Sequence, residues 1–136
     1  MTRESFKEWK KPEIKEGELT KWNWMVQGVK GLTLGDYVDI GSFSYINAQA
    51  GVEIGDYVQI GSHTSIYSVS TIDNKREKVV IEEYACVGSH SVVLPGAYIG
   101  KNSIVGAMSL VNKIIPANEV WAGCPARFIR KREERE

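Results

Sequence analysis

The sequence of 136 residues predicts an all-β protein, a three-sided parallel β-helix of about four coils. An aliphatic residue followed by glycine recurs at a spacing of six, as in Leu34-Gly35 and Ile40-Gly41. A small residue, Ser, Thr, Ala or Val, follows most of these aliphatic positions four places later. A period of six matches neither the 3.6 of a helix nor the simple alternation of a hairpin. Each hexapeptide therefore supplies one short strand and one corner, and three hexapeptides complete a coil.

The aliphatic positions predict the core of the β-helix. We expect each to stack on its counterpart one coil away, about 4.8 Å along the axis, which is the usual separation of neighbouring strands. Parallel strands with a buried inner side carry an aliphatic residue at each inward position. The inward positions form four triplets: Leu34, Ile40, Ile46; Ile54, Ile60, Ile66; Ile81, Val87, Val93; and Ile99, Val105, Val111.

The repeat divides the chain into three predicted segments. Residues 1–30 form an N-terminal segment that caps the open end of the prism. Residues 31–116 form the β-helix, from which a polar loop at residues 69–78 projects. Residues 117–136 hold a C-terminal motif and a short charged helix that ends the chain.

Composition excludes several classes of protein. The 17 Lys and Arg residues balance 17 Asp and Glu residues, so the chain lacks the basic excess of a nucleic-acid binder. No apolar run approaches the roughly 18 residues of a membrane span, and the charged N-terminus does not resemble a secretory signal. Cys86 and Cys124 form neither a disulfide framework nor a metal cluster by spacing. We expect a cytoplasmic protein without a nucleic-acid partner, a membrane span or a bound metal.

The repeat over about residues 31–130 resembles the left-handed β-helix acyltransferases with hexapeptide repeats. The stretches 111–116 and 120–127 resemble the ending shared by the sugar O- and N-acetyltransferases of that family. The resemblance implies a left-handed coil, although parallel crossovers are usually right-handed. It also implies a homotrimer, acetyl-CoA as the donor co-substrate, and active sites between neighbouring prisms. Residues 60–73 resemble the acceptor-side coil and loop, which often carries a catalytic histidine where this chain has Thr71.

Two histidines, His63 and His90, are the candidate general bases. Each lies three residues after an inward aliphatic residue, so both imidazoles should emerge from one corner, about 5–8 Å apart. A neutral imidazole there would take the proton of a sugar hydroxyl or amine as it attacks the thioester carbonyl. His63 is preferred because it adjoins the polar loop in sequence. Alternatively, both histidines are structural, because this corner favours a left-handed backbone that His tolerates better than most residues.

Polar and small residues supply the candidate binding groups. Asp73 would orient a histidine or bind the sugar, or it is a solvated loop carboxylate. Pantetheine is a chain of amides that needs exposed backbone between small residues, and the phosphates of coenzyme A need cations. The terminal charges alternatively form only a solvated helix face. The candidates for the acceptor are Asn47, Ser68, Thr71, Asp73 and Asn74. The candidates for the cofactor are Ala97, Gly106, Ala107, Lys113, Gly123, Arg127, Arg130 and Lys131.

The leading functional hypothesis is acetyl transfer from acetyl-CoA to a hydroxyl or amine of a sugar, by direct attack. The acceptor is expected to be a nucleotide-linked sugar of polysaccharide biosynthesis. A homotrimer is also expected because a small prism gains stability by burying a flank against its neighbours. One alternative is a non-catalytic trimer or binding module. The other is a zinc enzyme of the γ-carbonic-anhydrase type, which needs three histidines around the metal, although this chain lacks that family's close histidine pair.

Overall fold

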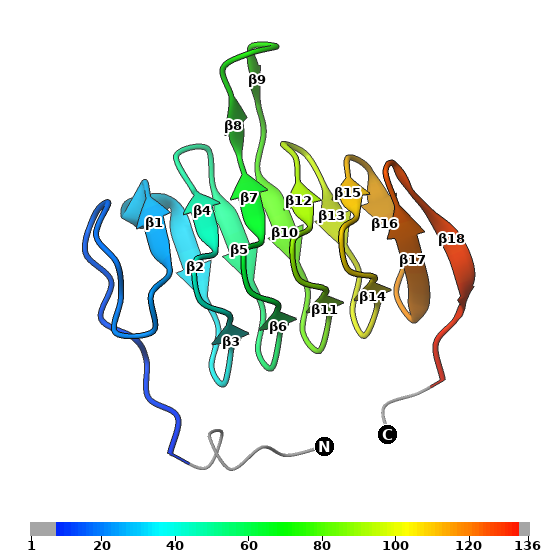
Figure 1. The fold of residues 1–136 in the computed structure, drawn as a ribbon, viewed down its shortest axis with the longest axis horizontal. Helices are drawn as coiled ribbons and strands as arrows, with labels where there is room; N and C mark the ends of the chain where they lie inside the picture. The colour runs from blue at the N-terminus through cyan, green and yellow to red at the C-terminus, as the bar shows by residue number, and fades with distance from the viewer. Residues whose placement is uncertain (1–7, 134–136) are drawn as a thin grey trace.

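Three parallel sheets form the sides of a prism in the computed structural model, which describes residues 8–133 (Figure 1). Side 1 consists of β1 (Met25–Gln27), β4 (Tyr45–Asn47), β7 (Ser65–Tyr67), β12 (Val92–Val93) and β15 (Leu110–Val111). Side 2 consists of β2 (Leu32–Leu34), β5 (Val52–Ile54), β10 (Val79–Ile81), β13 (Tyr98–Ile99) and β16 (Ile114–Ile115). Side 3 consists of β3 (Asp39–Ile40), β6 (Gln59–Ile60), β11 (Cys86–Val87), β14 (Ile104–Val105) and β17 (Glu119–Gly123), with β18 (Ala126–Lys131) added at its end.

The chain passes the three sides in order and makes about five turns, one more than the sequence predicts. The additional turn begins at β1, which pairs in parallel with β4 and places Val26 opposite Ile46. The predicted boundary at residue 30 is therefore too late. It was missed because the next inward residue, Leu34, follows Val26 by eight residues rather than six, and no aliphatic residue followed by glycine precedes Leu34. The all-β parallel solenoid itself is confirmed.

The predicted core is confirmed by the strand register. On side 1, Val26, Ile46, Ile66, Val93 and Val111 follow one another in register and are almost completely buried. Equivalent columns run along sides 2 and 3. Such a column excludes water along the whole axis, and apolar burial of this kind is the main stabilising contribution.

The small residue of the repeat has a second role at the corners. The Thr64 hydroxyl donates to the carbonyl of Gly61 at 2.8 Å, and the Ser109 hydroxyl donates to Gly106 at 2.6 Å. Both side chains are buried. A hydroxyl at this position therefore satisfies a corner carbonyl that would otherwise lack a partner inside the prism.

An antiparallel hairpin projects from the corner between sides 1 and 2 (Figure 1). Its strands are β8 (Val69–Ser70) and β9 (Lys75–Arg76), and both of its flanks join strands of the solenoid. Ile72 at the tip is 99% exposed. The hairpin therefore adds polar and exposed groups outside the prism.

The predicted C-terminal helix is wrong: residues 126–131 form β18, which runs antiparallel to β17. Phe128 packs edge-on against Trp121, with ring centroids 6.5 Å apart, whereas Ile129 is 57% exposed. The charged composition suggested a solvated helix, but the free edge of β17 offers this segment a ladder of backbone hydrogen bonds. Residues 134–136 of that prediction lie outside the described residues.

The described chain has one short helix, the 3-10 turn η1 (Val29–Gly31). Among the described residues there is no helix long and apolar enough to cross a membrane.

The N-terminal segment lies across the open end of the prism over residues 8–24, and residues 1–7 are outside the described part. The Trp9 indole N–H donates to the carbonyl of Val38 at 2.8 Å. The Glu16 carboxylate accepts the backbone N–H groups of Val29 and Gly28, and these bonds lower the pKa of Glu16. The segment is thus attached to the first turn at two separate places.

We predict that Ile81→Ala lowers the free energy of unfolding by about 2–5 kcal/mol, because Ile81 is buried and its removal leaves a cavity. The control is Ile72→Ala at the exposed hairpin tip, which should change stability by less than about 0.5 kcal/mol. Urea unfolding of both variants at one protein concentration checks this. Equal effects of the two substitutions would contradict the assigned core.

Candidate active site

One row of residues with a left-handed backbone occupies the corner between sides 3 and 1. Side chains other than glycine rarely adopt this conformation, and here the turn requires it once in each coil. The backbone N–H of His63 donates to the carbonyl of Ser42, and that of His90 donates to Ser62, each at 3.0 Å. The row comprises Asn23, Phe43, His63, His90 and Met108, with φ between 57° and 66°.

The structure brings the two predicted histidines together on this row. The imidazole rings of His63 and His90 stack with centroids 4.7 Å apart and planes 7° from parallel. The ring of Phe43 lies 5.5 Å from that of His63, on the preceding coil. Both histidines are exposed, so their ring edges are accessible to a ligand.

Phe43 and Met108 are residues of this row that the sequence analysis missed. Both are well exposed, at 58% and 75%. The signal was present, because Ile40-Gly41-Ser42-Phe43 has the same pattern as the phrases that end in His63 and His90. The histidine pair therefore lies between two exposed apolar side chains.

Within residues 8–133, no side chain forms a hydrogen bond or ion pair with either imidazole. The proposed pairing of Asp73 with a histidine is not present in the described chain. Asp73 instead accepts a hydrogen bond from the Ser70 hydroxyl, which lowers its pKa, and lies 3.8 Å from the Lys75 ammonium.

The hairpin and the histidine pair occupy different corners of one chain. His63 precedes β7, and the hairpin begins after β7 has crossed side 1. A strand advances about 3.3 Å per residue, so β7 separates them by roughly 10 Å or more. Proximity in sequence, the reason for preferring His63, is therefore not proximity in space. The acceptor candidates of the hairpin are exposed near its tip, at Thr71, Asp73 and Asn74.

Two further acceptor candidates, Asn47 and Ser68, meet inside the corner between sides 1 and 2. The Ser68 hydroxyl lies 3.3 Å from Asn47 Oδ1 and accepts the N–H of Ala50 at 2.9 Å. Asn47 Oδ1 also accepts the N–H of Gln49 at 3.1 Å. Both side chains are buried. They hold the backbone of Gln49 and Ala50 in place, with their polar atoms directed into the protein.

The candidates for the cofactor divide between corners. Gly106, Ala107 and Gly123 lie at the histidine corner, and a Cβ on Gly106 would meet that of Ala122 at 2.9 Å. Ala97 and Lys113 follow β12 and β15 on the hairpin corner, where Ala97 is buried. The structure thus places small residues beside the histidines but separates them from Lys113 within one chain.

The three cations of β18 are spread along the strand. Arg127 is opposite Ala122, near the histidine corner, whereas Arg130 and Lys131 lie toward the other end of β17. The Lys131 ammonium donates to Glu119 Oε2 at 2.7 Å. It is therefore engaged within the protein.

Glu119 is a buried carboxylate that the sequence analysis missed. It is 8% exposed and is held by Lys131 and by the Trp121 indole N–H, which donates at 2.9 Å. These two hydrogen bonds, that of Lys131 first, lower the pKa of Glu119. The strand pairing that joins Glu119 to Lys131 was hidden by the expectation of a helix.

Within the described range, no three His, Cys, Asp or Glu side chains group closely enough to hold a metal ion.

Comparisons with known proteins agree with this fold. A family model described as bacterial transferase hexapeptide (six repeats) matches residues 78–113. Galactoside O-acetyltransferase of Escherichia coli (strain K12) is 47% identical over 58 residues, which are 43% of this chain and 29% of that relative. The chain therefore spans less than a third of that relative.

Solved structures match over most of the chain. A hexapeptide-repeat acetyltransferase from Vibrio cholerae O1 biovar eltor, complexed with acetyl coenzyme A, has a TM-score of 0.75 and 28% identity over 82% of this chain and 66% of its own. A variant of AntD, an N-acyltransferase from Bacillus cereus, was solved with dTDP-4-amino-4,6-dideoxyglucose and coenzyme A. It has a TM-score of 0.59 and 26% identity over 82% of this chain and 72% of its own.

The chain therefore resembles the bacterial hexapeptide transferases in sequence over residues 78–113 and the solved hexapeptide-repeat acetyltransferase in fold over 82% of its length.

We predict that Glu119→Gln destabilises the protein at neutral pH and that this difference disappears in acid. The folded-state pKa of Glu119 is lower than its ordinary value of 4.5, so its stabilisation is complete above that value. The stabilisation is lost as the pH falls through the lowered folded-state pKa. Thermal unfolding of wild type and variant between neutral and acidic pH measures the difference.

The control for this pH series is Glu13→Gln, which makes the same change in charge on a side chain that is 84% exposed. Its effect should stay small throughout, as for most exposed ion pairs. If the difference in unfolding temperature between wild type and Glu119→Gln does not become smaller in acid, the stabilising role of the ionised Glu119 is contradicted.

Proposed function

We propose that this protein transfers an acetyl group from acetyl-CoA to a hydroxyl or amine of a sugar. The observation that supports this most directly is the exposed, stacked pair of His63 and His90 on a prism of the hexapeptide transferase family. Imidazole is the side chain best suited to accept and return a proton near neutral pH. The relatives include a galactoside O-acetyltransferase and an N-acyltransferase solved with an amino-sugar nucleotide, which supports both kinds of acceptor.

The proposed reaction is a direct attack with a histidine as general base. One imidazole takes the proton of the acceptor O–H or N–H while the acceptor atom forms its bond to the thioester carbonyl carbon. The carbon–sulfur bond then breaks, and coenzyme A leaves as the thiol with the proton returned by the imidazolium. Direct attack needs no covalent intermediate on the protein, and Cys86 lies within β11 on side 3 rather than on the histidine row.

The donor in this proposal lies along the histidine corner toward β18. Gly106, Ala107 and Gly123 leave backbone accessible for the amides of pantetheine, and the exposed Arg127 would pair with phosphate. Arg130 would be a second cation for the phosphates, whereas Lys131 would first have to break its ion pair with Glu119. Ala97 and Lys113, on the hairpin corner, would contact the donor only from another chain.

We infer a homotrimer with its active sites between chains, built on the left-handed coil of the family. One chain presents its acceptor candidates Thr71, Asp73 and Asn74 on a corner different from its histidines. A neighbouring prism that brings its hairpin to the histidine row would complete the site. The three-sided prism suits a closed cyclic assembly in which one flank is buried against the next chain.

The proposed acceptor is a nucleotide-linked sugar of polysaccharide biosynthesis, made in the cytoplasm where acetyl-CoA is available. The solved N-acyltransferase with a dTDP-linked amino sugar supports this class.

We predict that His63→Asn and His90→Asn, tested singly and together, identify the base. Removal of the catalytic imidazole should lower turnover by about 10²–10⁴-fold. Asn keeps the left-handed backbone, as Asn102 and Asn118 do on another corner. The measurement is steady-state acetyl transfer to a panel of sugars, with calorimetric titration of acetyl-CoA to show one binding site per chain.

The matched control is Met108→Asn on the same row, which should leave turnover close to that of wild type. A double histidine variant that retains full turnover would exclude the histidine base. Absence of acetyl-CoA binding by an intact trimer would exclude the transferase and leave a non-catalytic member of the family.

We predict that two inactive variants restore activity when mixed. One carries His63→Asn and His90→Asn, and the other carries Thr71→Ala, Asp73→Ala and Asn74→Gly in the hairpin. Mixed trimers would contain some interfaces with an intact hairpin facing intact histidines. Co-refolded samples should recover activity that separate samples lack, and a mixture as inactive as its parts would show that each site is built within one chain.

A further inference from the structure

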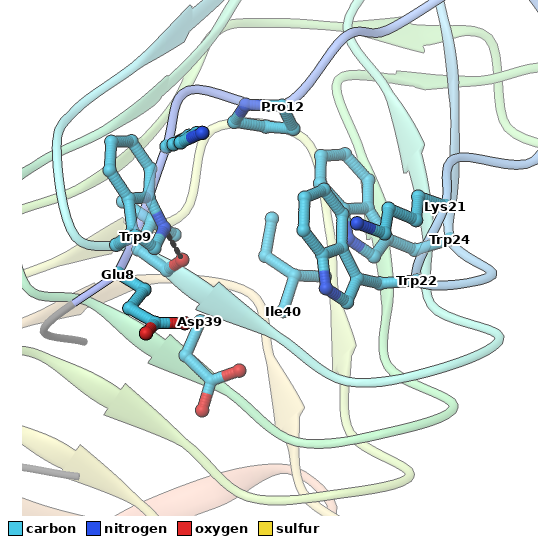
Figure 2. Close-up of a pocket in the computed structure, with 10 residues that line it drawn as sticks. Glu8, Trp9, Pro12, Lys21, Trp22, Trp24, Asp39 and Ile40 are labelled. Carbon is cyan, nitrogen blue, oxygen red and sulfur yellow. Dashed lines mark hydrogen bonds between the residues drawn. The ribbon is translucent and has the colours of Figure 1, made fainter. Parts of the chain in front are cut away.

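A cavity of about 680 Å³ lies at the N-terminal end of the prism, apart from the histidine pair. Its walls come from the N-terminal segment and from the first turn around β3 (Figure 2). This volume is within the roughly 300–1,000 Å³ of ordinary small-molecule sites. The position is outside residues 78–113, which the family model matches.

Three of the four tryptophans of the chain line this cavity. Trp9 lies on one side and Trp22 with Trp24 on the other, with Ile40 between them (Figure 2). Trp24 is buried, whereas Trp22 is 46% exposed. Indole faces carry a negative quadrupole and suit a ligand with a flat, slightly positive C–H surface.

The aromatic walls are held in place by the fold. The Trp9 indole is fixed by its hydrogen bond to Val38, and the backbone carbonyl of Trp22 accepts the Ser42 hydroxyl at 3.2 Å. A site that is formed before the ligand arrives loses less entropy on binding. The Trp9 side chain and the backbone of Trp22 are therefore held in place before a ligand arrives.

Charged groups of both signs line the same cavity. Glu8 and Asp39 contribute carboxylates, and Lys10 and Lys21 contribute ammonium groups. The Lys21 ammonium lies 5.7 Å from the centroid of the Trp22 ring. The two carboxylates would repel a polyphosphate, and the two ammonium groups would repel a quaternary ammonium ligand. A neutral ligand with many hydroxyls suits the mixture, since hydroxyls donate to carboxylates and accept from ammonium groups.

We infer that this cavity is a saccharide-binding site, in which a sugar ring packs its C–H face on Trp22 and hydrogen-bonds to the charged rim. Asn23, the neighbour of Trp22, begins the row that continues to His63 two coils later, roughly 10 Å away. A saccharide held there is thus separate from any ring at the histidines. The inference does not depend on acetyl transfer.

The test uses the indole N–H signals of the full-length protein in a nitrogen-15 NMR spectrum. Lactose, maltose and cellobiose are each titrated into the millimolar range without acetyl-CoA. Binding in the cavity should shift the signals of Trp9, Trp22 and Trp24, whereas that of Trp121, on β17, should stay in place. Thymidine diphosphate and choline are titrated in parallel as the anionic and cationic competitors.

Trp22→Ala should weaken the sugar affinity by about tenfold or more, because a central aromatic contact is removed. The Trp22 side chain is half exposed, and the hydrogen bond from the Ser42 hydroxyl is accepted by the backbone carbonyl of Trp22. The variant should therefore still fold. The matched control is Ile129→Ala on β18, which should leave the affinity unchanged. The inference is overturned if no sugar shifts the three signals, if Trp22→Ala binds as tightly as wild type, or if only thymidine diphosphate or choline shifts them.

Discussion

The close stacking of successive coils is the constraint on which the rest of the structure depends. Parallel strands in adjacent coils lie about 4.8 Å apart, so every side chain directed inward must fit between identical neighbours. The aliphatic columns satisfy this inside the prism. At the corners the backbone itself is crowded: a Cβ on Gly61 would lie 2.4 Å from the backbone nitrogen of Ser89. The repeat of aliphatic residue and glycine is the chemical result of these two requirements.

The same constraint explains which parts of the fold were predictable from the sequence. The central turns follow the hexapeptide pattern closely, and their register agrees with the predicted columns. The first turn was missed because Val26 lies eight residues before the next inward residue, Leu34, which breaks the spacing of six. The end of the chain was missed for a different reason. Whether residues 126–131 form a strand depends on the free edge of β17, which no local pattern of these residues reveals.

The candidate site shows a similar division. The stacking of His63 and His90 follows directly from their equal positions in two phrases of the repeat. The contacts of the hairpin could not be predicted in this way, because the repeat fixes the position of a residue within a coil and the hairpin interrupts the repeat. Asn47 and Ser68 illustrate the difficulty further: two polar residues beside a polar loop turned out to be partners of buried backbone groups. Sequence spacing thus located the row of histidines but could not assign every polar neighbour to solvent or to the interior.

The reversed direction of β18 has a consequence for self-association. A solenoid of parallel coils exposes at each end the same ladder that joins its own turns, so it offers a template on which further copies could add and grow into a fibre. On side 3 the last parallel strand is covered by an antiparallel one. A second molecule arriving at that end would meet a strand of the wrong polarity and exposed charges such as Arg127 and Arg130. The final six residues of regular structure therefore set the length of the prism and oppose end-to-end polymerisation on that side.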